Sequence, residues 1–189
     1  MIDVYEKCPV LEGSRFQLRF VENKDAKDLY QVYGDKKALP FFNSDNCHGC
    51  IFYCPKLKDV EETITYWTME YNNKGFVRWS IMDQEVKKVI GTIELFHRES
   101  NDYFNDCGLL RLDVASDYEM QTEMLKDILS IIIEPTYRLF DCSMIATKAA
   151  PYAVDRIQAL KETGFVLSEE KLVGHDGTEY RDYWVRMKN

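Results

Sequence analysis

Four potential metal ligands stand close together in the stretch Cys47-His48-x-Cys50-x-x-x-Cys54. Thiolates and neutral imidazoles are good zinc ligands, and Cys-x-x-Cys is a common half of a zinc site. The second half is missing here, and no third group stands ready to orient a Cys-His pair as a nucleophile. We therefore expect free or partly buried thiols and no metal site, with zinc binding as the alternative.

A second stretch with possible chemistry begins at Ser116. Ser116 and Glu119 have the spacing of a capping box, in which side chains satisfy the first N–H groups of a helix. Free N–H groups at a helix start can bind phosphate, and a capping box would use them internally. Asp117, Glu119 and Glu123 would also place three carboxylates there. The sequence therefore predicts weak or repositioned phosphate binding at this helix.

Composition narrows the class of protein. The 189 residues are 46% hydrophobic, which suits one domain over residues 1–189, and the net charge of −8 argues against nucleic acid as a partner. The longest apolar run, Ile128 to Ile133, is interrupted by Ser130 and is far shorter than the ~20 residues of a membrane span. Six irregularly spaced cysteines favour reduced thiols in a cytoplasmic protein, without structural disulfides.

Periodicity predicts the elements that must position these residues. Strand and helix alternate between Cys107 and Phe165, which indicates a βαβ unit with parallel strands and function at the strand ends. Pro135 is expected to end the first helix of this unit. The predicted strands are 14–21, 76–82, 88–96, 107–114 and 141–146, the predicted helices are 24–33, 59–75, 116–133 and 150–163, and a hairpin of 165–173 with 180–187 closes the chain.

Three short motifs stand within these elements: Ile90-Gly-Thr-Ile-Glu94, Val114-Ala-Ser-Asp-Tyr118 and Leu160-Lys-Glu-Thr-Gly-Phe165. With this element order, the chain from Phe16 to Met187 resembles the GNAT acetyltransferase superfamily, particularly its ribosomal-protein alanine acetyltransferases. The resemblance implies an α/β (α+β) fold. Its mixed, mostly antiparallel twisted sheet would be splayed between the fourth and fifth strands, flanked by helices, with acetyl-CoA in the gap.

The resemblance also implies where the cofactor binds. Residues 110–114 and 144–146 would line the gap, and backbone N–H groups would hold the pantetheine arm and polarise the thioester carbonyl. Met120 and Thr122 stand where the family's pyrophosphate loop has glycines, so phosphate contacts would come from Thr122, Lys126 or Arg156. The implied cofactor-binding residues are Leu112, Val114, Gln121, Thr122, Glu123, Met124 and Arg156.

The implied reaction needs a base, because an amine must lose a proton to attack. Glu94 and Asp113 are the candidate catalytic residues, although each could instead be a strand carboxylate that pairs with an arginine such as Arg111. The family's usual tyrosine corresponds to Leu160, so water would have to reprotonate the thiolate. The loop from Leu39 to Pro55 is expected to border the acceptor side, with apolar walls from Phe41, Phe42, Phe52 and Tyr53.

Two functions follow from the resemblance. The first is an N-acetyltransferase that moves acetyl from acetyl-CoA to a primary amine by direct attack, with a small molecule or a protein N-terminus as acceptor. The second is a non-catalytic GNAT-fold protein, ligand-binding or regulatory, that has lost ordinary CoA binding. Neither involves a nucleic acid or a membrane, and the sequence leaves the oligomeric state open.

Overall fold

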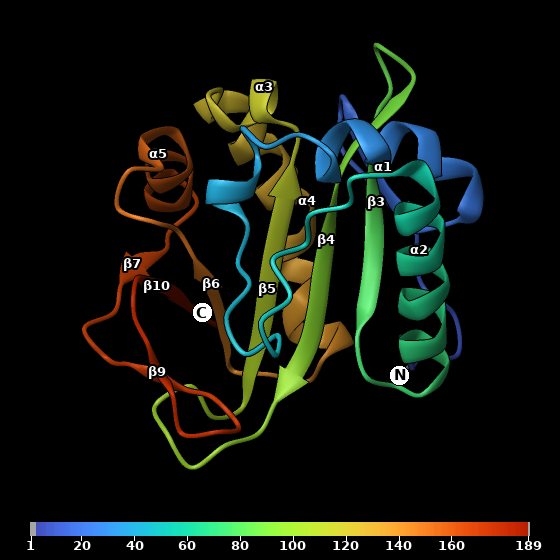
Figure 1. Cartoon of the computed structure of the whole chain (residues 1–189). Coiled ribbons are helices and arrows are strands. Elements are labelled where there is room, and N and C mark those ends of the chain that lie inside the picture. The colour runs from blue at the N-terminus through green and yellow to red at the C-terminus, as the bar shows by residue number, and fades with distance from the viewer. Residues whose placement is uncertain (1–2, 189) are drawn as a thin grey trace.

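A computed structural model describes residues 3–188, and its centre is a mixed eight-stranded sheet (Figure 1). The strand order is β1-β2-β3-β4-β5-β6-β10-β7, and a separate small sheet pairs β8 with β9. All neighbours are antiparallel except β5 and β6, which confirms the predicted fold class. The strands are β1 Leu11–Glu12, β2 Phe16–Phe20, β3 Val77–Asp83, β4 Lys88–Arg98, β5 Cys107–Val114, β6 Met144–Lys148, β7 Val166–Leu167, β8 Leu172–Val173, β9 Glu179–Tyr180 and β10 Tyr183–Met187.

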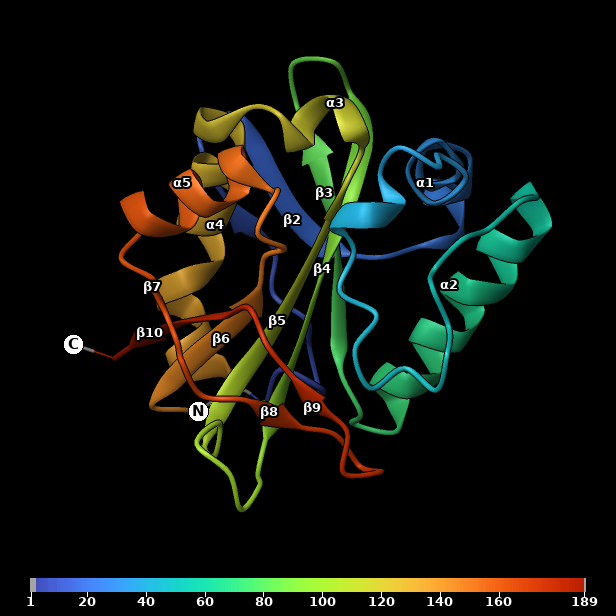
Figure 2. The same ribbon diagram turned by 60° about the vertical axis from the view of Figure 1, so that its left-hand side comes forward.

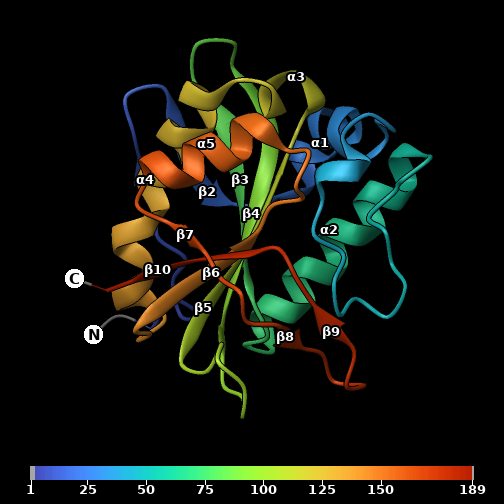
Figure 3. The same ribbon diagram turned by 90° about the vertical axis from the view of Figure 1, so that its left-hand side faces the viewer.

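Helices cover both faces of the sheet. Figure 2 shows α1 and α2 on one side and α4 and α5 on the other, and Figure 3 views the edge formed by β6, β10 and β7. None of the helices in residues 3–188 is long and apolar enough to cross a membrane. The helices are α1 Ala26–Tyr33, α2 Leu57–Asn72, α3 Ser116–Glu119, α4 Thr122–Leu139 and α5 Val154–Glu162, with short 3-10 turns η1 Asn23–Asp25 and η2 Leu39–Phe41.

The two faces of the central strands differ in chemistry. Side chains alternate along a strand, so Ile93 of β4 and Leu112 of β5 join the main apolar core, which also contains Leu125 and Ile128 of α4. Their strand neighbours on the opposite face are charged and equally buried: Glu94 of β4 is 2% exposed. The sheet thus offers an apolar face to α4 and a buried polar face to α1 and α2.

The strands β5 and β6 separate part of the way along. Their parallel ladder runs from Cys107 opposite Met144 to Leu110 opposite Thr147, and residues 111–114 of β5 pair only with β4. This confirms the predicted splay between the family's fourth and fifth strands, which are β5 and β6 here. We call the opening beyond Leu110 and Thr147 the β5–β6 gap.

The predicted helix 116–133 begins at the right residue, but it is interrupted after its first turn and ends later than predicted. The chain leaves the helix after Glu119 and starts α4 at Thr122, and α4 then continues through Pro135 to Leu139. Proline removes one backbone hydrogen bond, but the turn after it is anchored by other contacts. Thr136 is buried and its hydroxyl donates to the Ile132 carbonyl at 2.7 Å, while Tyr137 packs in the core. Burial therefore outweighs the local preference to stop.

The predicted closing hairpin is divided between two sheets. Around the turn at Gly177, whose φ is +82°, the short strands β8 and β9 pair close to the turn, and β7 pairs with β10 further from it, as the predicted hairpin requires. The last strand, β10, also pairs antiparallel with β6 and so joins the hairpin to the main sheet. The other predicted elements occur in the structure with somewhat different ends, and residue 189 of the C-terminus lies outside the described residues.

Candidate active site

The edge of β5 that borders the β5–β6 gap carries two backbone N–H groups. Ala115 N–H, just beyond β5, donates to the Ile90 carbonyl of β4 at 2.9 Å. Successive peptide groups of a strand point to opposite edges, so the N–H groups of Leu112 and Val114 point away from β4, toward the gap. These are the two groups predicted to contact pantetheine.

The start of α4 offers further donors. The first intrahelical bond runs from Leu125 N–H to the Gln121 carbonyl, and no side chain caps this end of the helix. The N–H groups of Thr122, Glu123 and Met124 therefore have no intrahelical partner, and the helix dipole makes this end attractive to anions. The Thr122 hydroxyl donates to the Asp155 carboxylate at 2.7 Å.

The predicted capping box is absent, which corrects the expectation for this helix. The Ser116 hydroxyl donates to the carboxylate of Asp35 at 2.6 Å, and the Glu119 N–H donates to the Ala115 carbonyl at 3.2 Å. The spacing was misleading because α3 ends after Glu119, so the helix with free donors begins at Thr122. Those donors are not used internally by Ser116 or Glu119.

Glu119 is instead paired with Arg156 of α5. Nε and a terminal nitrogen of the guanidinium donate to the two carboxylate oxygens at 2.7 and 2.6 Å, and each residue is 2% exposed. The pair neutralises one of the three carboxylates expected near phosphate, and it places the Arg156 guanidinium inside the protein. Met120, beside it, is 67% exposed.

Four charged residues form a buried cluster on the polar face of the sheet. The arginine cluster consists of Arg78, Glu94, Arg111 and Asp113, all of them 8% exposed or less. Both arginines donate to the Glu94 carboxylate, and Arg78 also lies 3.3 Å from Asp113. The sequence predicted a possible partner in Arg111 and did not reveal Arg78, whose guanidinium stacks 4.0 Å from the ring centre of Trp67.

The two carboxyls of the arginine cluster have opposite pKa shifts. Burial would raise the pKa of Glu94, but Arg78 and Arg111 outweigh it and hold this pKa below its usual value. Burial does raise the pKa of Asp113, and Arg78 and the Tyr33 hydroxyl, 2.9 Å away, offset this only in part. Glu94 is therefore stabilised as a carboxylate, whereas burial favours the neutral form of Asp113.

A cavity of about 490 Å³ opens beside α2, and Glu94 and Arg111 lie on its wall. Of the four predicted aromatic wall residues, only Phe52 lines it; Phe42 packs on Tyr33 with ring centres 5.4 Å apart. We call it the α2 cavity, and its lining comprises Asn46, Cys47, Cys50, Phe52, Tyr66, Trp67, Glu70, Gly75, Phe76, Glu94, Phe96, His97, Arg98, Glu99, Arg111 and His175. Sequence reasoning missed the α2 residues because they belong to an ordinary amphipathic helix pattern.

A crossing loop, residues 42–50, connects the strands on both sides of the β5–β6 gap. The carbonyl of Asp45 accepts a hydrogen bond from Arg111 of β5 at 3.0 Å. Its carboxylate accepts from Lys148 of β6 at 2.6 Å and from the hydroxyl of Tyr183 of β10 at 3.2 Å. Figure 1 shows this loop passing across the region between β5 and β6. The loop therefore ties β5 to β6 and β10 across the gap, and its residues Cys47 and Cys50 also border the α2 cavity.

The cysteine-rich stretch lies on this crossing loop and just beyond it. Cys47 and Cys50 line the α2 cavity, whereas Cys54 is buried, with its sulfur 3.8 Å from the Thr63 hydroxyl. All six cysteines are free. Burial raises the pKa of the Cys47 thiol, and the charge of Arg111 offsets this only in part. No three His, Cys, Asp or Glu side chains of residues 3–188 are placed to hold a metal ion.

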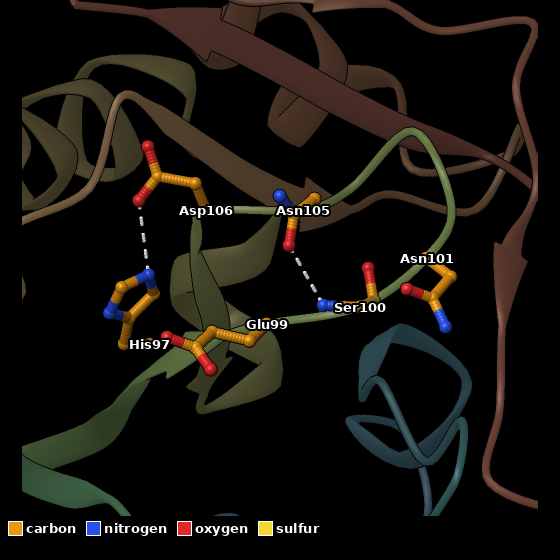
Figure 4. Close-up of a pocket in the computed structure, with 6 residues that line it drawn as sticks. All are labelled: His97, Glu99, Ser100, Asn101, Asn105 and Asp106. Carbon is orange, nitrogen blue, oxygen red and sulfur yellow. Dashed lines mark hydrogen bonds and ion pairs between the residues drawn. The ribbon is translucent and has the colours of Figure 1, made fainter.

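A second hollow, of about 670 Å³, adjoins the α2 cavity at His97 and Glu99 (Figure 4). Its His97 Nε2 lies 3.1 Å from the Asp106 carboxylate, and Ser100 is nearby. The Ser100 hydroxyl donates to Asp102, not to the imidazole, at 2.7 Å. These residues are therefore not arranged as a serine nucleophile with its base.

The sequence and the fold were compared with those of known proteins. No protein-family model and no curated protein matches the sequence. Solved structures do match. A GNAT-family acetyltransferase from Bacillus anthracis has a TM-score of 0.68 at 9% identity, with 95% of this chain and 98% of that chain covered. Ribosomal-protein-S5-alanine acetyltransferase from Vibrio fischeri has a TM-score of 0.66 at 15% identity, with 96% and 97% covered.

A third match is AAC(6')-Ib in complex with paromomycin and acetyl-CoA, with a TM-score of 0.67 at 14% identity, covering 93% of this chain and 94% of that one. At such identities the likeness concerns the fold. The sheet, its one parallel pair and the splay agree with it. The chain has the fold of the GNAT acetyltransferases, as its sequence motifs predicted.

Proposed function

We propose that this protein is an N-acetyltransferase that moves the acetyl group of acetyl-CoA to a primary amine by direct attack. The observation that carries the proposal is the β5–β6 gap, into which the N–H groups of Leu112 and Val114 point. Two groups of free donors, one on β5 and one at the start of α4, are what a thioester with a pyrophosphate tail requires. The likeness to AAC(6')-Ib, whose structure contains acetyl-CoA, supports it.

The residues at the start of α4 fit a pyrophosphate. The N–H groups of Thr122, Glu123 and Met124, with the preceding Gln121, would hold it at the positive end of the helix dipole. In this proposal Arg156 acts indirectly, because it is buried and its guanidinium neutralises Glu119. Glycine is not needed at position 120, since the Met120 side chain is exposed to solvent.

The acceptor amine would reach the thioester from the α2 cavity. Glu94 lines this cavity and stays ionised, so it can accept a hydrogen bond from the amine. Because its lowered pKa makes it a weak base, water carries the proton of the amine away. Asp113 does not line the cavity and positions Arg78 and Tyr33. As the amine nitrogen bonds to the carbonyl carbon, the oxyanion is stabilised by the β5 N–H groups, and the thiolate of CoA then leaves and is reprotonated by water.

The non-catalytic alternative differs in a measurable way. The first experiment is a calorimetric titration of the protein with CoA, followed by an assay of thiol release from acetyl-CoA with a panel of amines. The proposal expects CoA binding together with amine-dependent release above hydrolysis. CoA binding without turnover on any amine would favour a ligand-binding or regulatory role, and failure to bind CoA would overturn the proposed enzyme.

A further inference from the structure

The basic and acidic residues that line the α2 cavity differ in whether they form ion pairs. Arg111 is paired with Glu94, and Arg98 is paired with Asp102 at 2.6 Å. The carboxylates of Glu70 and Glu99 also line the cavity, and neither forms an ion pair within residues 3–188. Positive charge in the lining is thus matched, whereas two carboxylates lack a counterion. The cavity is therefore complementary to a cation.

The position of Glu70 on α2 also favours a cation in the cavity. It lies in the last turn of the helix, which has no basic residue, and a negative charge there opposes the helix dipole. Its carboxylate folds over Gly75, where a Cβ atom would collide with it, and Gly75 N–H donates to the Glu70 carbonyl at 2.8 Å. A carboxylate held at an unfavourable helix end, facing a cavity, is stabilised when a cation binds beside it.

The remaining walls of the cavity are mainly aromatic. Five aromatic rings contribute. They come from the residues just after the crossing loop, from α2 and the residues after it, and from β4. The rings of Tyr66 and Phe76 lie with their centres 6.3 Å apart in an edge-to-face arrangement. Aromatic walls offer flat apolar area for the body of a ligand, because Arg78 already stacks on Trp67 and the rings are not left to receive its charge. The five residues are Phe52, Tyr66, Trp67, Phe76 and Phe96.

We infer that the α2 cavity binds a primary amine with an aromatic body, whose ammonium group is received by the carboxylate of Glu70. The inference rests on the proposed function in that it names the class of acceptor. An amine with several charges spread along it fits less well, because Arg98 and Arg111 occupy other parts of the lining. The bound ammonium must lose a proton before it attacks, and Glu94 in the same lining can then accept a hydrogen bond from the neutral amine.

The test is a binding measurement without any CoA, with 2-phenylethylamine and its uncharged analogue 2-phenylethanol as probes. Calorimetry is performed on the wild type, Glu70→Gln and the matched control Glu62→Gln, which lies on the same helix with an exposed side chain. We expect the wild type and the control to bind the amine roughly tenfold more tightly than the alcohol. Glu70→Gln is expected to lose that preference while its circular dichroism is unchanged.

Three results would overturn the inference: equal affinity for amine and alcohol, an unchanged preference in Glu70→Gln, or tighter binding of spermidine or of a basic N-terminal peptide. If Glu70→Gln does not fold, Phe76→Leu takes its place and must weaken the binding of both probes, since it removes a ring from the wall. Because CoA is left out, a negative result here, beside CoA binding and turnover of another amine, refutes the aromatic acceptor alone. Absence of CoA binding refutes the proposed enzyme.

Discussion

The guanidinium of Arg156 donates hydrogen bonds to both carboxylate oxygens of Glu119, at 2.7 and 2.6 Å, where almost no solvent reaches. The pair joins α3 to α5 and so fixes the two residues that separate α3 from α4. A buried pair of this kind adds little net stability compared with apolar residues, but loss of one partner leaves an unpaired buried charge. It therefore fixes the position of the donors of α4.

Removal of the Glu119 charge should destabilise the protein strongly. We expect Glu119→Gln to lower the free energy of unfolding by about 3–5 kcal/mol, because Arg156 is left buried without a counterion. The measurement is urea unfolding followed by circular dichroism. Glu123→Gln, at an exposed position nearby, is the control and should change little. The double variant Glu119→Leu, Arg156→Met should recover most of the loss; a single variant as stable as the wild type would contradict this.

The backbone donor of Thr122 can be tested apart from its side chain. Proline is tolerated as the first residue of a helix and lacks the N–H, and Gln121, with φ −133° and ψ 88°, lies outside the helical region that is disfavoured before proline. We expect Thr122→Pro to weaken CoA binding several-fold. Thr122→Val, which loses the hydroxyl bond to Asp155 and keeps the N–H, should bind CoA like the wild type. Equal affinities of the two variants, by calorimetry, would argue against the backbone contact.

The two carboxyls of the arginine cluster should give opposite pH effects. The pKa of Glu94 lies below its usual 4.5, so wild-type stability from this group is present above that value and is lost as pH falls through the folded-state pKa. The pKa of Asp113 lies above its usual 3.8, so its contribution is present below that value and is lost as pH rises through the folded-state pKa. Across about pH 3 to 7, the destabilisation by Glu94→Gln should therefore grow up to about pH 4.5 and then stay level, while that by Asp113→Asn should shrink as pH rises above 3.8.

Urea unfolding of both variants and the wild type at several pH values in this range is the measurement. The quantity compared is the difference in unfolding free energy between each variant and the wild type. Other groups that titrate alike in both proteins cancel in this difference. Slopes of the same sign for the two variants would mean that the pKa shifts do not oppose each other.

The crossing loop should depend on Asp45 for its order. Asp45→Ala removes the acceptor of Lys148 and of the Tyr183 hydroxyl, whereas the Asp45 carbonyl bond to Arg111 remains possible. We expect faster amide hydrogen exchange in residues 42–50 with little change in the central strands, because local opening of a loop costs less than global unfolding. Asp127→Ala, at an exposed position on α4, is the control. Uniformly faster exchange over the whole chain would show a global effect instead.

The fold could largely be predicted from the sequence because its information is local and periodic. Alternation in Ile90 to Leu95 and the strand-helix-strand order after Cys107 indicate the sheet and its parallel pair, and both occur. The error at Pro135 has a physical cause: a proline weakens one turn, but burial of Thr136 and Tyr137 depends on partners distant in sequence. Such long-range compensation is not visible in a local pattern.

The candidate site was less predictable than the fold. Leu112 and Val114 are implied by the resemblance to the GNAT superfamily, and the strand register places their N–H groups on the edge of β5 away from β4. Glu119 illustrates the opposite case: its spacing from Ser116 indicated a local cap, yet its partner Arg156 stands 37 residues away. Arg78 and Glu70 gave no signal because a strand arginine and a helix glutamate are common. Only the tertiary structure places one in a buried cluster and the other beside a cavity.

The crossing loop has a further consequence for kinetics. Asp45 is bonded to Arg111 on one strand and to Lys148 on the other, so the loop spans the β5–β6 gap, and its Cys47 and Cys50 border the α2 cavity. In the proposed enzyme, the thioester would enter from the α4 end and the amine from the α2 side. Two substrates that approach from opposite entrances can be bound at once, and neither must leave before the other arrives. Such an enzyme follows a sequential scheme with a ternary complex, whose double-reciprocal plots intersect rather than run parallel.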